Sequence, residues 1–549
     1  MTVLALPWVG SAQRTPDAVL SRVRYWLPLL VIGVAQAVYT VRLIPLGYLS
    51  TDEARYIVAG HVLIHQLFHG GGSPYYETYF SGAPDVYSPL AAMADFIGGV
   101  VAVRLMSMCF MLLATYLLFR SAERLAGYVA AVCSAGLFAG LGMTQVVGRN
   151  TIYDAMAFTL TALAAYCAVR ARDGDAKWLL LVPLVLFAAY FTKYMTILFD
   201  PVVIALASLG VGPWRESVRR LFVLGFTTAC AIALGVFLAG GAYLHGMIFT
   251  TFSRQTGDNR LLGAQLVSDH FILFHAWKWM GALVLLSLLA VGVSLITRRT
   301  LTPVLAVCAL AGLLVTLEAL HLHSNESMRR HDDLGAWFAA IPAGYLMSLP
   351  VQLVRKLSWK RSFATAALVA LVAAWGYYGQ LPSTFSQQTG YDTGNSGNPA
   401  PLAGVLKPYL VPGHEYLLSG LDNFSTIYDD HLAGTLPWYA YATDDNYIKY
   451  PIPGRGGDWS GQVAGRTCQK LLPGCVYLEG AAAYRAAIAA HAFAVIELSR
   501  EQKYPPITTD PAIEDAAEHT PGYVQVIQKG HFSVWLYLPD YEKQVSSAA

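Results

Sequence analysis

Charged residues are scarce in this sequence, and this scarcity excludes a soluble protein. Only 13% of the 549 residues are charged, 55% are hydrophobic, and the mean hydropathy is +0.45. Soluble domains usually have about a quarter of their residues charged. The net charge of +2 and the lack of any basic stripe give no indication of a nucleic-acid partner. The composition predicts a helical protein that crosses a membrane several times.

Cysteines are also few, and the sequence shows neither a signal-peptide cleavage site nor an internal repeat. Five of the seven cysteines lie in apolar runs and are predicted to be small core residues: Cys109, Cys133, Cys167, Cys230 and Cys308. Cys468 and Cys475 lie close together in the polar C-terminal part, where a local disulfide is predicted if that part is outside the cytoplasm. No small-residue cleavage site follows the first apolar run, which is therefore interpreted as an anchor. No internal repeat is found.

Long apolar stretches fill the first two thirds of the chain. At roughly 20 residues per spanning helix, they predict an α-helical polytopic membrane protein of about eleven transmembrane helices within residues 25–380. The stretches are 25–47, 97–119, 126–146, 152–171, 177–192, 194–211, 221–244, 278–297, 302–320, 334–354 and 362–379.

Basic residues between these stretches predict the orientation. If residues 1–24 are cytoplasmic, the main clusters of Arg and Lys fall on the cytoplasmic side and the opposite loops hold only scattered basic residues. The chain is therefore predicted to be a multi-pass protein of the plasma (inner) membrane. A long first loop, 48–96, and everything after residue 380 would then lie outside the cytoplasm.

The C-terminal residues 381–549 are predicted to form a soluble extracytoplasmic α/β domain. A link rich in Asn, Gly, Ser and Pro, 383–401, precedes it, and an Ala-rich stretch at 480–491 is expected to be helical. The β-like runs are 416–418, 476–478, 493–497, 523–527 and 532–537.

Two adjacent carboxylates, Asp52 and Glu53, follow directly on the first apolar stretch. They begin a predicted surface helix, Thr51–Leu67, which a second, Pro89–Ile97, follows in the same loop. Ser50 and Glu53 also have the spacing of a capping box, so a purely structural role is an equal alternative. If Ser50 caps the helix, Glu53 folds back on the cap and Asp52 points elsewhere.

Further ionisable groups lie at the predicted outer face. Placing such a group at the edge of the membrane costs free energy, so each is a candidate functional site. Arg149 and Asp154 flank a short outer turn, Lys193 interrupts an apolar stretch, and Arg329 and Arg330 precede the tenth span. Structural alternatives exist for each group. Lys193 could snorkel to the interface, Arg149 could pair with Asp154, and the two arginines could be solvated. Asp332 and Asp333 could cap the tenth helix.

Carboxylates and cations on one outer face, beside long apolar walls, suit a particular chemistry. A carboxylate can take the proton from an attacking hydroxyl. Lys193 with Arg329 or Arg330 could hold a phosphate on a lipid, because fixed cations stabilise a departing phosphate. Arg149 is a further candidate for that phosphate.

At these residues the chain resembles the GT-C superfamily of polyprenyl-phosphate-sugar-dependent glycosyltransferases, in particular lipid A aminoarabinose transferases and protein O-mannosyltransferases. The resemblance covers roughly the first 350 residues. Arg330-His331 followed by Pro342 is a looser match. The motifs that carry it are Leu43-Ile44-Pro45 with Thr51-Asp52-Glu53-Ala54-Arg55-Tyr56, then Val103-Arg104, Tyr153-Asp154 and Thr192-Lys193-Tyr194.

The resemblance implies a one-step inverting transfer of a sugar from a polyprenyl-phosphate donor to an acceptor on a glycan, lipid or protein of the cell envelope. In such enzymes the first aspartate, here Asp52, is the candidate base with Glu53 beside it. Asp154 would help to bind donor or acceptor. Lys193 and the late arginine, Arg329 or Arg330, would engage the lipid phosphate.

One departure from the family pattern concerns the donor site. The lipid A enzymes have a Lys-Pro pair in the first loop, where this chain has Tyr87-Ser88-Pro89. A cation expected near the donor is missing, so the family pattern does not identify the donor sugar. A divalent cation (Mg, Mn or Ca) is associated with some members, and Asp52, Glu53 and Asp154 offer oxygen ligands for one.

Two rival functions are considered. A multi-span transporter or lipid-linked sugar flippase would place its ionisable residues near the midplane, commonly with repeat symmetry. This sequence concentrates them on one face. A scaffold whose tail binds glycan would use aromatic residues such as Trp438, Tyr439, Tyr441 and Trp459, which serve equally well as core.

Overall fold

The computed structural model describes most of the helical part and the ordered elements of the tail. The described residues are 16–46, 49, 51–69, 80–172, 176–248, 268–297, 300–323, 328–353, 384, 415–418, 441–444, 449–451, 477–499, 510–529 and 532–539.

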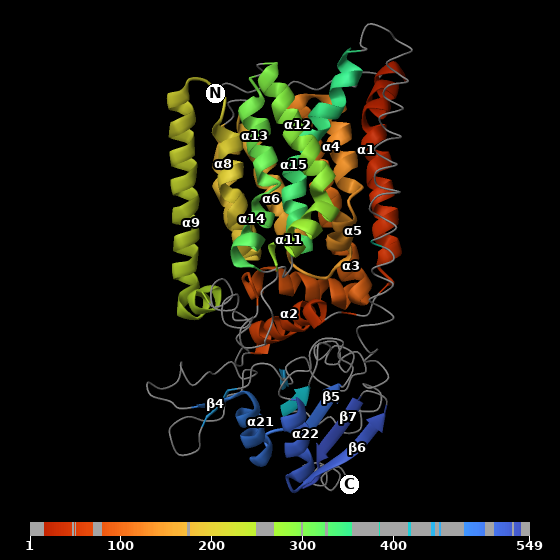
Figure 1. Ribbon diagram of the computed structural model, residues 1–549, viewed down its shortest axis with the longest axis vertical. Helices are drawn as coiled ribbons and strands as arrows, with labels where there is room; N and C mark the ends of the chain where they lie inside the picture. The colour runs from red at the N-terminus through yellow and green to blue at the C-terminus, as the bar shows by residue number, and fades with distance from the viewer. Residues whose placement is uncertain are drawn as a thin grey trace, which may run out of the picture.

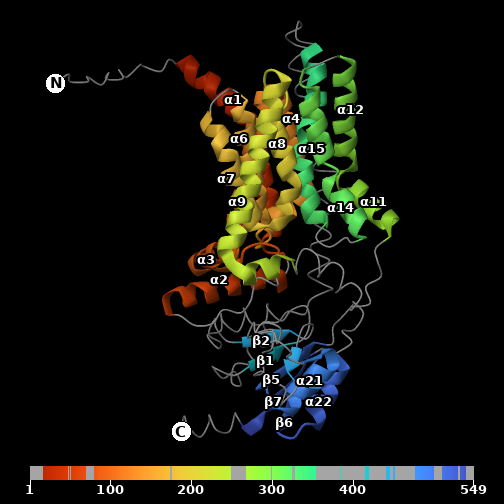
Figure 2. The same ribbon diagram turned by 90° about the vertical axis from the view of Figure 1, so that its left-hand side faces the viewer.

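Most helices run along a common axis and form one bundle (Figure 1). Helix α2 and the first part of α3 run across its lower end instead (Figures 1 and 2). The helices are α1 (Pro16–Leu43), α2 (Thr51–His69), α3 (Pro84–Ala126), α4 (Tyr128–Ala139), α5 (Gly142–Arg149), α6 (Asp154–Ala171), α7 (Ala176–Thr192), the 3₁₀ helix η2 (Tyr194–Phe199), α8 (Asp200–Ser208), α9 (Trp214–Ile248), α11 (Asp269–Ala276), a π-turn (Trp277–Gly281), α12 (Ala282–Ile296), α13 (Thr302–Ala311), α14 (Leu314–Leu322) and α15 (Met328–Leu353).

The predicted membrane segments coincide with helices wherever the structure describes them. Each apolar stretch before residue 355 falls on one or two helices, and 362–379 lies outside the described residues. Within the described ranges, five helices are long and apolar enough to span, or six if the bent pair α4 and α5 forms one span. The segments at 177–192 and 194–211 are shorter helices, so the total of about eleven stays a prediction.

The predicted helices of the first loop are confirmed as α2 and the first part of α3. The break between the two parts of α3 lies at Gly98 and Gly99, where Gly99 has φ of +64°. A side chain is strained at that φ, so glycine allows the chain to turn from the crossing direction into the bundle. This turn keeps α2 against the end of the bundle.

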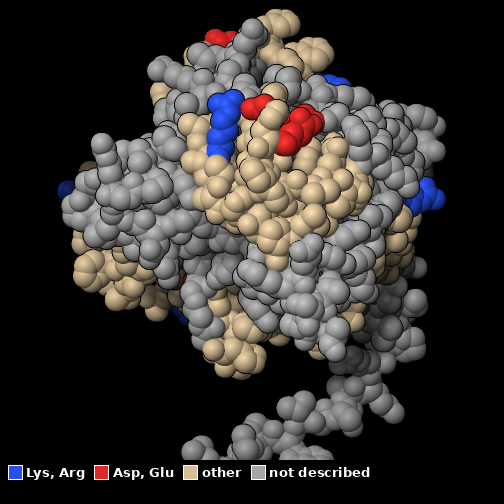
Figure 3. Space-filling model, turned by 90° about the horizontal axis from the view of Figure 1, so that it is seen from below, with Lys and Arg blue, Asp and Glu red and all other residues tan. Residues whose placement is uncertain are grey.

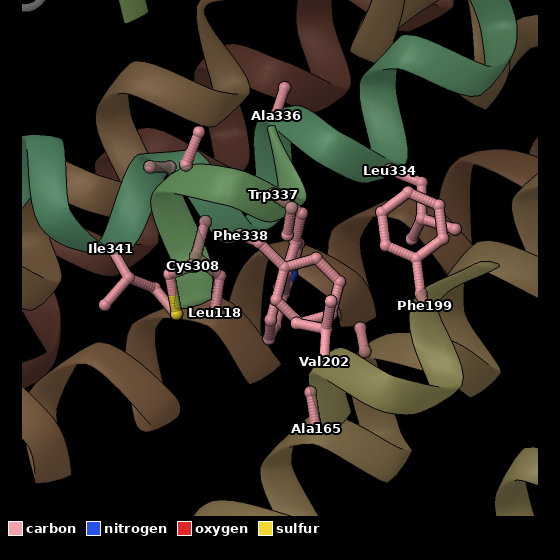
Figure 4. Packing of buried hydrophobic residues seen from close by; sticks show 14 of the residues in the cluster. Leu118, Ala165, Phe199, Val202, Cys308, Leu334, Ala336, Trp337, Phe338 and Ile341 are labelled. Atoms are coloured by element: carbon pink, nitrogen blue, oxygen red, sulfur yellow. The ribbon is translucent and has the colours of Figure 1, made fainter. Parts of the chain in front are cut away.

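The bundle core is built from aromatic and small residues that interdigitate (Figure 4). Phe199 and Phe338 stack with ring centroids 5.6 Å apart. The indole of the fully buried Trp337 donates to the Ala114 carbonyl at 3.0 Å, which satisfies its only polar group. Cys133, Cys167 and Cys308 are buried as predicted, whereas the core prediction is wrong for Cys109 and Cys230, which are exposed.

The described part of the tail contains a five-stranded sheet in the order β2-β1-β5-β7-β6. β1 is parallel to β2 and β5, and β7 is antiparallel to β5 and β6. All five predicted runs coincide with strands; the short β2 and β3 were not predicted. The elements are β1 (Glu415–Leu418), β2 (Tyr441–Asp444), β3 (Lys449–Pro451), β4 (Tyr477–Glu479), α21 (Gly480–Ala489), β5 (Val495–Ser499), α22 (Asp510–His519), β6 (Tyr523–Lys529) and β7 (Phe532–Tyr537).

The sheet and α2 lie at the same end of the molecule (Figures 1 and 2). Helices α21 and α22 pack together with β5 and β7 around a second core that includes Tyr484, Phe493 and Trp535. The first loop and the tail thus share one end, as the predicted topology requires. That this end is extracytoplasmic stays a prediction.

The close contact of α2 with α3 gives a testable consequence. A Cβ on Gly60 would collide with the Ser88 carbonyl and lie 2.8 Å from the Ala92 side chain. We expect Gly60→Ala to destabilise the protein by about 1 kcal/mol or more, because neither helix backbone can move freely. Thermal unfolding of the purified protein in detergent measures this loss.

Gly225→Ala is the matched control. No atom lies within 4 Å of a Cβ at this helical glycine. Alanine favours helix there, so the control should keep or slightly raise the unfolding temperature. Equal stability of the two variants would contradict the tight packing of α2 on α3.

Candidate functional site

Ionisable side chains from five helices and one connecting residue meet where α2 crosses the end of the bundle. They form two groups, and the division between them decides which residues are available for chemistry. The residues are Asp52 and Glu53 in the first turn of α2, Arg104 in α3, Arg149 at the end of α5, Asp154 at the start of α6, Lys193 between α7 and η2, and Arg330 and His331 in the first turn of α15.

The first group is a buried ion cluster of Glu53, Arg104 and Arg149. The Glu53 side chain is 2% exposed, and its Oε2 lies 3.3 Å from Arg104 Nη2 and 3.9 Å from Arg149 Nη1. Its Oε1 accepts the Thr151 N–H at 3.0 Å. Glu53 is therefore committed to holding α2 against three other segments. This cluster is called the buried clamp below.

The two arginines of the buried clamp also hold the end of α1. Arg104 donates to the Ile44 carbonyl at 2.5 Å, and Arg149 donates to the carbonyls of Leu43 and Leu46. Arg149 does not pair with Asp154, the structural alternative that the sequence offered. Its Nη1 also donates to Asn150 Oδ1 at 3.1 Å. These contacts give Arg149 a structural role, and its predicted role as a phosphate ligand stays a prediction.

Asp52 lies in a different environment from its neighbour Glu53. Its side chain is 55% exposed, and its Oδ2 is 3.6 Å from Arg330 Nη2. The Ser50 side of the predicted capping box lies outside the described residues, as does the Arg329 side chain. Of the two adjacent acids, Asp52 is the accessible one.

The second group centres on Asp154, which accepts a hydrogen bond from Lys193 Nζ on Oδ1. Lys193 is 5% exposed, so it does not snorkel to the surface. Its Nζ also lies 4.9 Å from the centroid of the Tyr153 ring, a cation–π distance. His331 Nε2 is 4.0 Å from the same Asp154 oxygen. Sequence reasoning did not assign His331 a role.

Backbone contacts hold Lys193 in place. The Ala83 N–H donates to the Phe191 carbonyl at 2.7 Å, and the Tyr194 N–H donates to the Ser81 carbonyl at 2.8 Å. Between these bonds, Gly82 packs directly on the Thr192 carbonyl, where no side chain would fit. The chain before α3 thereby fixes the non-helical residue between α7 and η2.

Aromatic rings lie close to both the buried clamp and the Asp154 group. Tyr56 packs against Phe80 at 4.5 Å, Tyr153 at 4.6 Å and Tyr87 at 5.9 Å between ring centroids. Burial, with the neighbouring Tyr153 adding to it, raises the pKa of the Tyr56 phenol well above its usual value, so the ring stays neutral. Tyr87, next to the position where the lipid A enzymes have a lysine, is part of this aromatic wall.

The predicted metal ligands do not converge. Among the residues that the structure describes, no group of three or more His, Cys, Asp or Glu side chains could hold a metal ion. Asp52, Glu53 and Asp154 each face a different basic side chain, which does not fit a cation shared by the three. The predicted pair Cys468 and Cys475 lies outside the described residues.

The capping interpretation of Asp332 and Asp333 is wrong. Helix α15 already includes Met328, so these acids lie in its second turn, and both are fully buried. Asp333 Oδ1 accepts a hydrogen bond from the Thr144 hydroxyl at 2.6 Å, which joins α15 to α5.

Comparisons with known proteins agree with this architecture. Residues 91–243 match the family model described as dolichyl-phosphate-mannose-protein mannosyltransferase. ArnT from Cupriavidus metallidurans in the apo state aligns with a TM-score of 0.55 and 14% identity over 96% of this chain and 99% of that chain. ArnT bound to undecaprenyl phosphate aligns with a TM-score of 0.56 and 12% identity over 94% and 99%. This chain has the GT-C fold.

A more distant GT-C structure gives the same result. Archaeal oligosaccharyltransferase AglB from Archaeoglobus fulgidus, in complex with an inhibitory peptide and a dolichol-phosphate, aligns with a TM-score of 0.52 and 13% identity over 94% of this chain and 74% of that chain. A search of the curated proteins found no significant match. The predicted resemblance to the GT-C superfamily is confirmed, and the transporter alternative is not favoured.

The underside of the molecule carries no concentrated charge in its described part. Figure 3 shows a few acidic and basic side chains near one another among uncharged residues.

The buried clamp makes a prediction about stability. We expect Glu53→Gln to lower the free energy of unfolding by about 3 kcal/mol, because two buried arginines lose their counter-charge. Thermal unfolding in detergent would show the loss as a lower midpoint.

Glu216→Gln is the control, because Glu216 pairs with Arg219 at 2.8 Å and Arg220 at 2.9 Å near the start of α9, and Arg219 is largely exposed. Solvent screens such pairs, so the midpoint should not move. A Glu53→Gln midpoint equal to that of Glu216→Gln would show that the clamp contributes nothing to stability.

Proposed function

We propose that this protein is an inverting glycosyltransferase that moves a sugar from a polyprenyl-phosphate donor to an acceptor hydroxyl or phosphate at the outer face of the membrane. The observation that carries the proposal is the separation of the two acids. Both carboxylate oxygens of Glu53 contact members or neighbours of the buried clamp. Asp52 is exposed beside Arg330, at the same end of the bundle as Lys193.

Asp52 is the general base in this proposal. It accepts the proton of the acceptor hydroxyl while the acceptor oxygen attacks the anomeric carbon of the sugar. The bond from that carbon to the phosphate oxygen breaks, and the electron pair stays on the phosphate. A single displacement inverts the anomeric centre. Arg330 Nη2, 3.6 Å from Asp52 Oδ2, faces the carboxylate from the first turn of α15.

Lys193 and Arg330 are the proposed ligands of the lipid phosphate. Fixed cations stabilise the charge that develops on a departing phosphate, and both side chains are held by elements at this end of the bundle. Asp154 keeps Lys193 in position until the donor binds. ArnT has been solved bound to undecaprenyl phosphate and AglB in complex with a dolichol-phosphate, which supports a lipid-linked donor here.

The acceptor is a glycan, lipid or protein of the cell envelope, outside the plasma (inner) membrane. It approaches from the end of the molecule where the C-terminal sheet lies (Figure 1). Buried residues of α2 and of β5 and β7 belong to one hydrophobic cluster, including Ile57, Val495 and Leu536. We propose that the tail, residues 381–549, is an extracytoplasmic α/β domain that helps to select the acceptor.

The base assignment predicts the effect of Asp52→Asn. The amide cannot accept a proton, so we expect transfer from a polyprenyl-phosphate sugar to fall by about a hundredfold or more, while folding is unchanged because the side chain is exposed. Turnover in reconstituted liposomes measures the effect.

Asp85→Asn is the control for this change. Asp85 is an exposed acid in the first turn of α3, in the same part of the chain. Its substitution should leave turnover unchanged. Near wild-type turnover of Asp52→Asn would remove Asp52 from the role of base.

The phosphate assignment predicts the effect of removing Lys193. We expect Lys193→Ala to weaken donor binding by about tenfold or more and acceptor binding little, because a charge-assisted contact to phosphate is lost. Equilibrium binding of the donor and steady-state KM values for donor and acceptor measure the two effects.

A double variant separates binding from folding. Lys193→Ala alone leaves the buried Asp154 carboxylate without its lysine, which destabilises the protein. Lys193→Ala combined with Asp154→Asn removes that charge while still lacking the cation, so the stability should recover and the donor affinity should stay low. Recovery of donor affinity in the double variant would contradict the assignment.

A further inference from the structure

His331 carries a buried polar atom that the fold itself does not use. Its Nε2 is shielded from solvent and has no hydrogen-bond partner among the residues that the structure describes. Burying such a group costs free energy unless something binds it. An orphaned nitrogen in the first turn of α15, at the candidate site, therefore indicates a missing ligand.

The surroundings of His331 indicate the chemistry of that ligand. Asp154 lies 4.0 Å from Nε2, too far for a hydrogen bond. Lys193 and Arg330 also lie within Coulombic range of the imidazole, so these two basic groups and one carboxylate face it from α6, from the α7–η2 junction and from α15. Glu318 of α14 also lies within Coulombic range of Lys193. Three basic side chains around one position favour an anion.

The charges of this site are already balanced before an anion arrives. Lys193 is hydrogen-bonded to Asp154, and Arg330 faces Asp52. His331 Nε2, in contrast, has no hydrogen-bond partner among the residues that the structure describes. It is therefore available to respond to added negative charge without breaking an existing ion pair.

The proposed reaction creates such a charge. The donor is a phosphodiester with one negative charge, and breaking its bond to the sugar leaves a phosphate monoester. The monoester loses its second proton near pH 6. Burial and the neighbouring Lys193 hold the pKa of His331 well below its ordinary value, so the imidazole is neutral until a second phosphate charge arrives. An imidazole beside the phosphate can donate from Nε2 to the new oxygen and carry a proton when the second charge is present.

We propose that His331 is a phosphate ligand that distinguishes the polyprenyl monophosphate product from the diester donor. Lys193, Arg330 and His331 together bind the phosphate. His331 contributes mainly after the sugar has left, when the phosphate carries its second charge. His331 would thereby stabilise the leaving group and set how tightly product is retained. This inference rests on the proposed function, because it assigns the phosphate of that reaction.

Two lipid probes test the proposal on the full-length protein in nanodiscs. Undecaprenyl monophosphate represents the product, and its methyl ester, a diester with a single charge, represents the donor phosphate. We expect His331→Gln to bind the monophosphate about tenfold more weakly than wild type, and the methyl diester about twofold more weakly at most. Glutamine keeps a hydrogen-bond donor but cannot carry a proton.

The readout is the ratio of the two dissociation constants. This ratio does not depend on the fraction of protein that is folded, because both probes report the same folded molecules. His321→Gln is the matched control: His321 is an exposed histidine in the last turn of α14, and its substitution should leave both affinities unchanged. Competition with inorganic phosphate distinguishes a lipid phosphate site from a general phosphate site.

The outcomes separate the two proposals. A ratio unchanged from wild type, with either no loss or equal losses for the two probes, would overturn the role of His331 and leave the proposed function standing. Failure of wild-type protein to bind either lipid would overturn both. Displacement of the lipids by millimolar inorganic phosphate would assign the site to free phosphate. It would overturn the proposal that His331 distinguishes the lipid monophosphate product from the donor.

Discussion

The buried clamp is the constraint on which the site depends. Glu53, Arg104 and Arg149 are almost free of solvent, and together they bind the end of α1, the start of α2, α3 and α5. Charges buried at such a position are stable only when they satisfy one another. Because the clamp fixes the first turn of α2, it also fixes the direction of Asp52, one residue away on a different face of the helix.

The ionisable residues of the site fall into two groups with different roles, the buried clamp and the Asp154 group. In the clamp, every cation faces backbone carbonyls or a buried acid, so its members hold segments together. In the second group, Lys193 faces Asp154 and Arg330 faces Asp52, acids that a lipid phosphate would replace in the proposed reaction. His331 Nε2 has no hydrogen-bonded partner among the described residues. The fold thus places a rigid, buried support beside a second group of charges, as the proposed transfer from a lipid phosphate to a polar acceptor requires.

Much of the fold could be predicted from local patterns. The apolar stretches, the surface helices of the first loop and five of the strands follow from residue periodicity, and helices or strands are found at each predicted place that the structure describes. The prediction failed for Cys109 and Cys230, which face outwards, because a spanning helix is apolar on all sides when lipid replaces water. It also failed for Asp332 and Asp333, whose helix begins earlier than the polar residues suggested.

The sequence by itself determined that this is a helical membrane protein, that acids and bases gather at one end, and which superfamily it resembles. Only the tertiary structure decided which charges meet. Glu53 contacts Thr151, 98 residues away, because α5 bends from α4 by 66° and brings the end of α5 to α2. Ion pairing depends on distances of a few ångströms, which breaks such as Gly99 and the α4–α5 bend set. Spacing along a chain does not encode those distances, so Arg149 and Lys193 looked alike in sequence and differ in the fold.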